Sequence, residues 1–186
     1  AIVLLGRNTG ELGGSEYLKT VHDRVAGDAP ALDLEAEAAL HGATLEAIRA
    51  GLVRSAHDCA EGGLAVALAE SAFADPARPF GVQVDLGDDL PSPALLFGEA
   101  QSRIVVACAP ESVEPLLALA RGHGVPAVVI GRVGPVGGEF RIGIRGGGIR
   151  APVAELAGIY YSAIPRRMDG SPADVETSLE SEVQHA

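Results

Sequence analysis

Cysteine and tryptophan are scarce in this sequence of 186 residues, which contains two Cys and no Trp. Two cysteines do not make a disulfide framework of the kind that holds small secreted domains together. Cys108 lies in the apolar run 104–108 and is predicted to be a small buried side chain. Cys59 follows His57 and Asp58, but no second group of His and Cys has metal-ligand spacing, so no metal site is predicted.

Long apolar runs and basic residues are also few. No stretch is long enough to span a bilayer and no signal-peptide pattern is present, which predicts a soluble, cytoplasmic protein that does not bind membranes. Lys and Arg number 14 against 25 Asp and Glu, for a net charge of −11, which argues against nucleic-acid binding. A small phosphorylated ligand remains compatible with this charge, because a local nest of backbone N–H groups can bind it.

Several common motifs are absent, namely the Walker-A pattern, the G-x-S-x-G elbow and the EF-hand loop. The only Met is Met168, and the sequence begins directly in a predicted strand, so we expect a piece of a longer polypeptide that starts at a domain boundary. Residues 1–168 are expected to form one folded domain. Residues 169–186 contain five acids and no Lys or Arg, and they are expected to form a disordered acidic tail.

Apolar periodicity predicts the secondary structure. Strands are predicted at 2–5, 81–86, 103–109, 127–133 and 140–145, and helices at 15–25, 33–53, 63–74, 94–100, 112–123 and 151–166. Residues 55–62 and 146–148 are predicted loops. Because strands and helices mix without strict βαβ alternation, we expect an α+β fold with a mixed, largely antiparallel sheet flanked by helices.

Three helices have a stripe of residues that is predicted to be buried. The stripes are Leu34, Ala38, Leu45, Ile48 and Leu52 in the helix 33–53; Val113, Leu116, Leu117 and Ala120 in the helix 112–123; and Val153, Leu156, Ile159, Tyr160 and Ile164 in the helix 151–166.

The first candidate binding motif is the glycine turn Gly13-Gly14-Ser15 before a predicted helix. Glycines allow positive φ and close approach of a ligand, and Ser15 can cap the helix while free N–H groups face a phosphate. The alternative is that the glycines only turn the chain and Ser15 only caps.

The second motif is His57-Asp58-Cys59-Ala60-Glu61-Gly62-Gly63. One interpretation is a phosphate- or nucleotide-binding turn formed by His57, Asp58, Gly62 and Gly63, with His57 as a donor. The alternative is a tight loop in which Asp58 caps the next helix and Glu61 completes a capping box.

The third motif is Glu99-Ala100-Gln101-Ser102-Arg103, just before a strand. Glu99, Gln101, Ser102 and Arg103 are candidates for substrate binding, since an acceptor and an amide suit sugar hydroxyls and an arginine suits phosphate. The alternative is an internal ion pair between Glu99 and Arg103 that orders the loop.

Taken in order, the segments 10–17, 30–37, 51–70, 96–106 and 151–165 resemble the C-terminal domain of the formylglycinamidine ribonucleotide synthases, which are related to aminoimidazole ribonucleotide (AIR) synthetases. The resemblance spans residues 1–168. It implies the last domain of a multidomain ligase subunit that converts formylglycinamide ribonucleotide, ATP and ammonia to the amidine in purine biosynthesis. ATP or ADP and Mg²⁺ are then expected in the whole enzyme, with no cofactor assigned to this fragment.

The resemblance also implies partners and limits. The expected partners are the other domains of the subunit, a glutaminase subunit that supplies ammonia, and a small accessory subunit. The family's catalytic groups lie in the other domains, so no catalytic residue is expected in this chain. In the other repeat of such enzymes a Glu-Ser-Gln triplet contacts the substrate, whereas this chain has Ala100 at the middle position.

That departure suits a copy of the domain that lines a pseudo-symmetric nucleotide site. Two alternatives remain at this stage. One is a packing module without a ligand, and the other is a domain of a related thiamine-monophosphate kinase, selenophosphate synthetase or hydrogenase-maturation enzyme.

Overall fold

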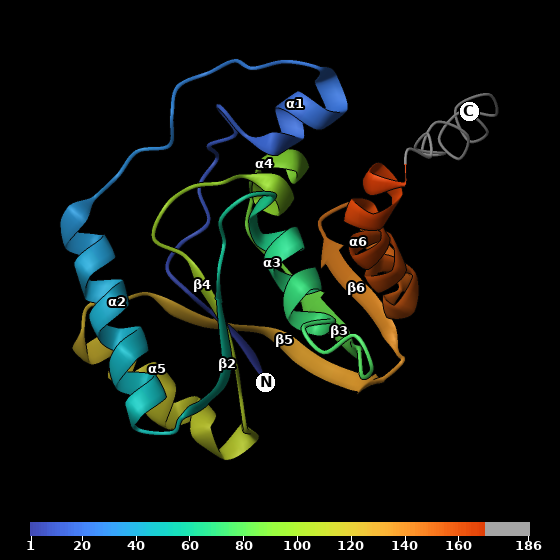
Figure 1. Ribbon diagram of the computed structural model, residues 1–186. Coiled ribbons are helices and arrows are strands. Elements are labelled where there is room, and N and C mark those ends of the chain that lie inside the picture. The colour runs from blue at the N-terminus through green and yellow to red at the C-terminus, as the bar shows by residue number, and fades with distance from the viewer. Residues whose placement is uncertain (170–186) are drawn as a thin grey trace.

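A computed structural model describes residues 1–169 as one seven-stranded sheet with helices on both faces (Figure 1). The strands are β1 (Ile2–Leu5), β2 (Val53–Asp58), β3 (Phe80–Asp85), β4 (Ile104–Cys108), β5 (Ala127–Val136), β6 (Glu139–Ile144) and β7 (Gly147–Pro152). The helices are α1 (Glu16–His22), α2 (Leu34–Arg49), α3 (Gly63–Ala72), α4 (Ser92–Phe97), α5 (Val113–Gly122) and α6 (Val153–Met168), with a 3₁₀ turn at Pro110–Ser112.

The strand order is β2-β4-β1-β5-β3-β6-β7, and every pair is antiparallel except β3 with β6. This mixed, largely antiparallel sheet confirms the α+β expectation. None of the helices in residues 1–169 is long and apolar enough to cross a membrane. The predicted acidic tail lies almost wholly outside the described residues.

The short strand β1 lies inside the sheet, between β4 and β5, and is buried on both faces. Ile2 and Leu4 point into a core formed with α3, α4 and α6, while Val3 and Leu5 point into a second core formed with α2 and α5. A continuous apolar run is what a strand covered on both faces requires, so the prediction for 2–5 is confirmed.

The other half of the sheet is covered on one face only. In β6, Phe140 and Ile142 are buried in the first core, whereas Glu139 and Arg141 between them are exposed. Helices α2 and α5 lie side by side over β2, β4, β1 and the start of β5, so one face of β3, β6, β7 and the rest of β5 stays uncovered (Figure 1). We call this uncovered surface the open face.

Two strands are missing from the sequence prediction, which had loops at 55–62 and 146–148. Residues 53–58 form the edge strand β2, and residues 147–152 form the opposite edge strand β7. Both are exposed along much of their length, so they lack the apolar signal of interior strands. The helix predicted at 33–53 accordingly ends at Arg49, and the one predicted from 151 begins at Val153.

The predicted stripe of α2 is wrong, and that of α6 is confirmed only at its start, where Val153 is buried and Leu156 packs against the first core. The sheet-facing side of α2 consists of Leu40, Ala43, Thr44 and Ala47, while Leu34, Leu45 and Ile48 are exposed. In α6 only Val153 and Ala157 are buried, and Ile159, Tyr160 and Ile164 are exposed. The stripe of α5 is confirmed, with Leu116 and Ala120 fully buried.

Candidate functional site

One carboxylate connects the three sequence motifs. Glu99 Oε1 accepts a hydrogen bond from the backbone N–H of Glu16 at 2.9 Å and another from that of Gly62 at 2.8 Å. These N–H groups belong to the N-terminal ends of α1 and α3, which need an acceptor and favour negative charge. Glu99 therefore occupies the position between the two glycine turns where an anion is electrostatically favoured.

The first glycine turn is packed against the chain itself. A Cβ on Gly13 would lie 2.2 Å from the carbonyl oxygen of Asp28, so the backbone of residues 27–28 passes directly over it. Gly14 has φ +67° and donates to the carbonyl oxygen of Ala26 at 2.9 Å. Ser15 is the N-cap of α1, and its hydroxyl accepts from the N–H of Leu18. These groups hold the loop that follows α1.

The second glycine turn packs just as closely. Gly62 and Gly63 both have positive φ, and a Cβ on Gly63 would lie 2.4 Å from the carbonyl oxygen of Gly98. The N-cap of α3 is Gly62, with no side-chain hydrogen bond. The predicted capping by Asp58 is therefore wrong, because Asp58 lies in β2 and the carboxylate of Glu99 takes the capping position instead.

His57 and Asp58 lie in β2, where successive side chains point to opposite faces of the sheet. His57 Nε2 is 3.3 Å from Glu70 Oε2 on α3, and Nδ1 is 2.7 Å from the carbonyl oxygen of Asp58. Glu70 in turn raises the pKa of Tyr160 on α6, chiefly through its negative charge. His57 thus joins β2 to α3 and lies on the side away from the polar cavity described below.

Arg103 is almost fully buried, with 3% of its surface exposed. Its guanidinium donates to the carbonyl oxygens of Gly98 at 2.5 Å and Ala100 at 3.3 Å, and to Asn8 Oδ1 at 3.1 Å. Burial lowers its pKa from the ordinary value. Within residues 1–169 it has no carboxylate at ion-pair distance, so the predicted internal pair of Glu99 with Arg103 is not formed.

A polar cavity of about 280 Å³ brings the second and third motifs together beside α2. Its lining includes Glu37, His41, Asp58, Cys59, Ala60, Gln101, Ser102 and Arg103. The cavity therefore combines two carboxylates, one amide and one hydroxyl group, which can recognise sugar hydroxyls or an amide.

Glu37 and His41 are members of this cavity that sequence reasoning missed. The hydroxyl of Ser102 donates to Glu37 Oε2, and His41 Nε2 is 2.8 Å from Glu37 Oε1. Ser102 has φ +58°, a conformation unusual for a residue with a side chain, and such strain is concentrated at functional sites. The available signal was the spacing of Glu37 and His41, which places both on one face of a helix.

Cys59 contributes to the cavity as a thiol. Burial raises its pKa to about 11, so the nucleophilic thiolate is scarce at neutral pH. Within the described residues no group of three or more His, Cys, Asp and Glu side chains is placed to hold a metal ion.

Iodoacetamide is expected to alkylate Cys59 slowly at pH 8 in the folded protein, since the reaction requires thiolate. Its rate should rise as the pH approaches about 11, or when urea unfolds the chain. Mass spectrometry of the cysteine-containing peptides measures both rates, and a short peptide with a free thiol is the control. Rapid alkylation of the folded protein at pH 8 would contradict the buried position.

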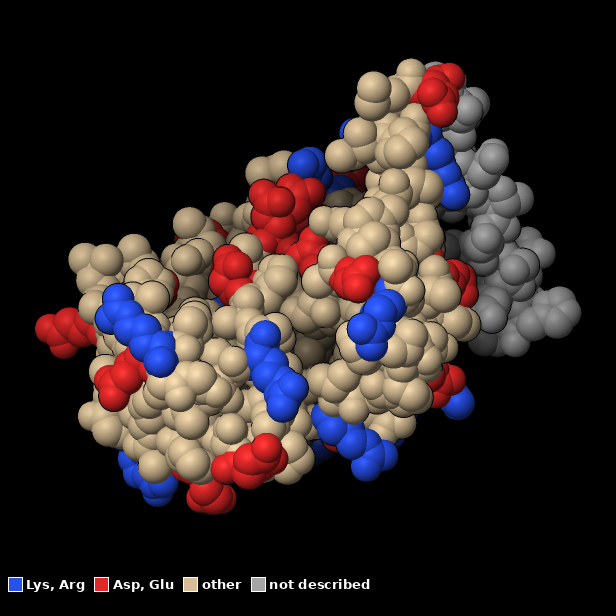
Figure 2. Space-filling model, turned by 60° about the horizontal axis from the view of Figure 1, so that its bottom comes forward, with Lys and Arg blue, Asp and Glu red and all other residues tan. Residues whose placement is uncertain are grey.

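A second, apolar cleft of about 530 Å³ lies at the far end of the sheet, lined by parts of β1, β2, α3, β3 and the end of β4. Figure 2 views the molecule from that end and shows a hollow near the middle, with Lys or Arg side chains on either side of it. None of the predicted site residues lines this cleft.

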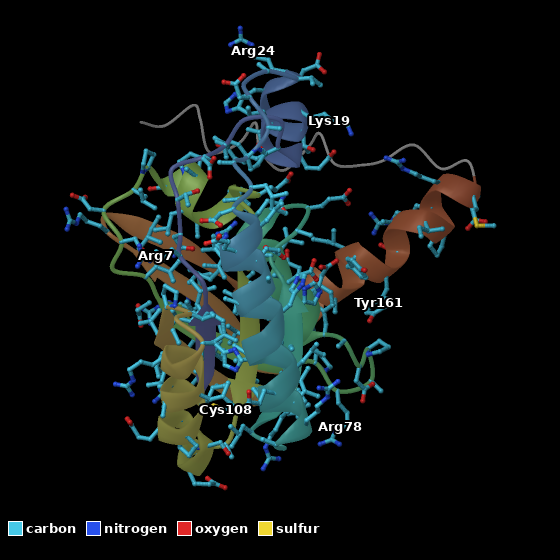
Figure 3. The ribbon with its side chains drawn as sticks, turned by 90° about the vertical axis from the view of Figure 1, so that its left-hand side faces the viewer. Arg7, Lys19, Arg24, Arg78, Cys108 and Tyr161 are labelled. Carbon is cyan, nitrogen blue, oxygen red and sulfur yellow. The ribbon has the colours of Figure 1, made fainter. Side chains whose placement is uncertain are left out.

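Figure 3 shows Lys19 and Arg24 at the far tip of the molecule, around α1, projecting away from its body.

Comparison with known proteins finds a matching family model and similar sequences that share one name. The family model for AIR synthase related protein, C-terminal domain, matches residues 1–143. A phosphoribosylformylglycinamidine synthase subunit PurL of Moorella thermoacetica is 56% identical over 133 residues, covering 72% of this chain and 18% of the relative. The PurL of Symbiobacterium thermophilum is 46% identical over 182 residues, covering 90% of this chain and 23% of the relative.

Solved structures of PurL from Thermotoga maritima share the fold. The complex with FGAR superposes with a TM-score of 0.65 at 27% identity, covering 84% of this chain and 27% of that one. The complex with ATP gives a TM-score of 0.64 at 27% identity, with 84% and 25% covered. The chain spans about a fifth of the length of the curated relatives that it matches. With matches of this extent, the chain belongs to the family of AIR synthase related proteins, C-terminal domain.

Proposed function

We propose that this chain is the C-terminal domain, residues 1–168, of the synthetase subunit that makes formylglycinamidine ribonucleotide in purine biosynthesis. The whole enzyme would be an ATP-dependent ligase that uses formylglycinamide ribonucleotide and glutamine-derived ammonia. The observation that carries the proposal is the convergence of all three motifs on Glu99, beside a polar cavity, in a chain 56% identical to a PurL subunit.

The ligands of the relatives support this substrate class. Structures of Thermotoga maritima PurL are complexes with ATP, ADP, AMPPCP and FGAR. In this chain, Gln101 and Ser102 at the cavity are the candidate contacts with a substrate or nucleotide. We assign a structural role beside that cavity to Glu99, Arg103 and the glycines, because their hydrogen-bonding and packing partners lie within the protein.

We assign Mg²⁺ to the complete enzyme and no magnesium ligand to this chain. Across residues 1–169 no group of three or more His, Cys, Asp and Glu side chains is placed to hold a metal ion. The proposed partners are the remaining domains of the subunit, a glutaminase subunit and a small accessory subunit, in line with a PurLQS assembly from Thermotoga maritima. We place the complex in the cytoplasm, where purine synthesis takes place.

A second candidate function is a packing module without a ligand. It is favoured by the same contacts that fill the glycine turns, since Glu99 already satisfies two of the N–H groups that could face a phosphate. The two candidates differ at Gln101, which is exposed at the cavity and makes no hydrogen bond through its side chain in the described part of the chain.

Replacing Gln101 with alanine in the complete synthetase subunit separates these candidates. A binding role predicts about tenfold weaker calorimetric affinity for FGAR or ADP at unchanged melting temperature, because one or two ligand hydrogen bonds are lost. Thr20→Ala, an exposed change on α1, is the control. Unchanged affinity for both ligands would favour the packing module.

His57→Ala is expected to change turnover of the complete subunit by less than about threefold, whereas loss of a general acid costs about 10² to 10⁴-fold. The reason is that His57 contacts Glu70 and lies outside the polar cavity. Steady-state rates with FGAR, ATP and ammonia measure the effect. A near-total loss of turnover at unchanged melting temperature would place His57 in the catalytic machinery.

A further inference from the structure

Four side chains form a row across the open face of the sheet. Gln83 on β3 is paired in register with Arg132 on β5 and with Arg141 on β6, and Arg141 is paired with Arg150 on β7. Directly paired residues project from the same face, so the row crosses four strands and is about 14 Å long at the usual strand spacing. We call Arg132, Arg141 and Arg150 the arginine row.

The arginine row carries more positive charge than its neighbours balance. Arg141 pairs with Asp85 at 3.2 Å and Arg150 with Glu139 at 2.6 Å. Arg132 instead donates twice to the neutral Oε1 of Gln83, at 2.9 and 2.6 Å. The row is therefore a locally positive surface on a chain whose net charge is −11. The two hydrogen bonds to Gln83 hold Arg132 in place, and its remaining N–H groups are available to bind a carboxylate.

This arrangement is unfavourable for the isolated sheet. Arg141 and Arg150 are directly opposite each other, and like charges in that position destabilise a pair of strands. The core does not require them, because the buried face of β6 is made by Phe140 and Ile142. The ion pairs of Arg141 and Arg150 offset this repulsion only in part, and Arg132 has no acidic partner within the described residues, which points to a functional surface.

The open face extends over four strands, which suits a broad partner. A Cβ on Gly143 would lie 2.3 Å from Asp85 Oδ1, so glycine at this position lets the pair of Asp85 and Arg141 lie across the strands. Four strands of about six residues cover roughly 19 by 20 Å. Contact over that area would bury about 800 Å² on the two surfaces together, within the range of interfaces between domains.

We propose that the arginine row docks the open face onto an acidic surface of another part of the same synthetase polypeptide. This inference rests on the proposed function, since it requires a subunit longer than this chain. Carboxylates of the partner would pair with Arg132 and bridge toward Arg141, removing the repulsion within the row. Val129, which lies on the same face and is 45% exposed, would supply an apolar contact at the border with the covered half.

Arginine footprinting of the complete subunit tests this docking. Phenylglyoxal modifies accessible guanidinium groups, and mass spectrometry gives the rate at each arginine without any added nucleotide or substrate. Docking predicts that the arginine row reacts at least about tenfold more slowly than Arg49 and Arg121, exposed arginines on α2 and α5 that form no ion pair within the described residues. Equal rates for the row and these two controls would overturn the proposal.

Removing two arginines tests whether the row itself holds the contact. Arg132→Ala with Arg141→Ala should raise the reactivity of Arg150 to the level of the controls, while Arg49→Ala with Arg121→Ala should leave it protected. Persistent protection of Arg150 in the row variant would overturn the proposal. So would protection that appears only when ATP or FGAR is added, because the face would then contact a small ligand. Turnover of the wild-type subunit, measured in parallel, tests the proposed function independently.

Discussion

Arg103→Ala should lower the free energy of unfolding by about 4 kcal/mol, among the largest effects expected of a single substitution in this chain. The change removes a buried side chain and leaves the carbonyl oxygens of Gly98 and Ala100 and the amide of Asn8 without their donor. At this chain length the melting temperature should fall by roughly 8 to 16 °C. Thermal unfolding followed by circular dichroism measures the change.

Two further variants identify the cause of that loss. Arg121→Ala removes an exposed arginine and should stay within about 0.5 kcal/mol of wild type. Arg103→Met keeps much of the buried volume but no donor, so it should fall between wild type and Arg103→Ala. If Arg103→Ala instead weakened binding of FGAR to the complete subunit with no change in melting, Arg103 would be a ligand contact and not an internal clamp.

The elements that the sequence predicts well are those with a strong apolar signal. The strand at 2–5 and the buried stripe of α5 follow directly from the periodicity of Val, Ile and Leu. The edge strands β2 and β7 lack this signal, because the residues of β2 are half exposed and polar and β7 begins with two glycines. They are strands because β4 and β6 pair with them, a tertiary effect that local pattern does not carry.

The candidate site could likewise be predicted from the sequence only in part. The motifs were recognisable from glycines and capping residues, but their relation depends on contacts between distant residues. Glu99 lies 83 positions from Glu16 and 37 from Gly62, and no local rule selects an acceptor at such separations. The side chain of Arg103 likewise turns inward to backbone carbonyls, which only the course of residues 98–103 determines.

Glu99→Ala is the second large effect that we expect, and it bears on the whole site. Without the carboxylate, the N–H groups of Glu16 and Gly62 lose a charged acceptor at the ends of two helices. Two such bonds amount to about 3 kcal/mol, or a fall in melting temperature of roughly 6 to 12 °C. Glu99→Gln keeps an acceptor oxygen but no charge, so it should lose about half as much.

Glu61→Ala is the matched control for Glu99→Ala, because it removes an acid of the same charge beside the start of α3 that makes no hydrogen bond within the described residues. Its melting temperature should stay close to that of wild type. Hydrogen exchange at Glu16 and Gly62 provides a local readout, since both amides should lose protection only in the Glu99 variants.

Inorganic phosphate that restored both protection and melting temperature in Glu99→Ala would mean that an anion can replace the carboxylate. The two glycine turns would then be a latent phosphate site that Glu99 occupies in this chain. Absence of any rescue would mean that the turns serve packing alone, and the binding role would rest on Gln101 and the polar cavity.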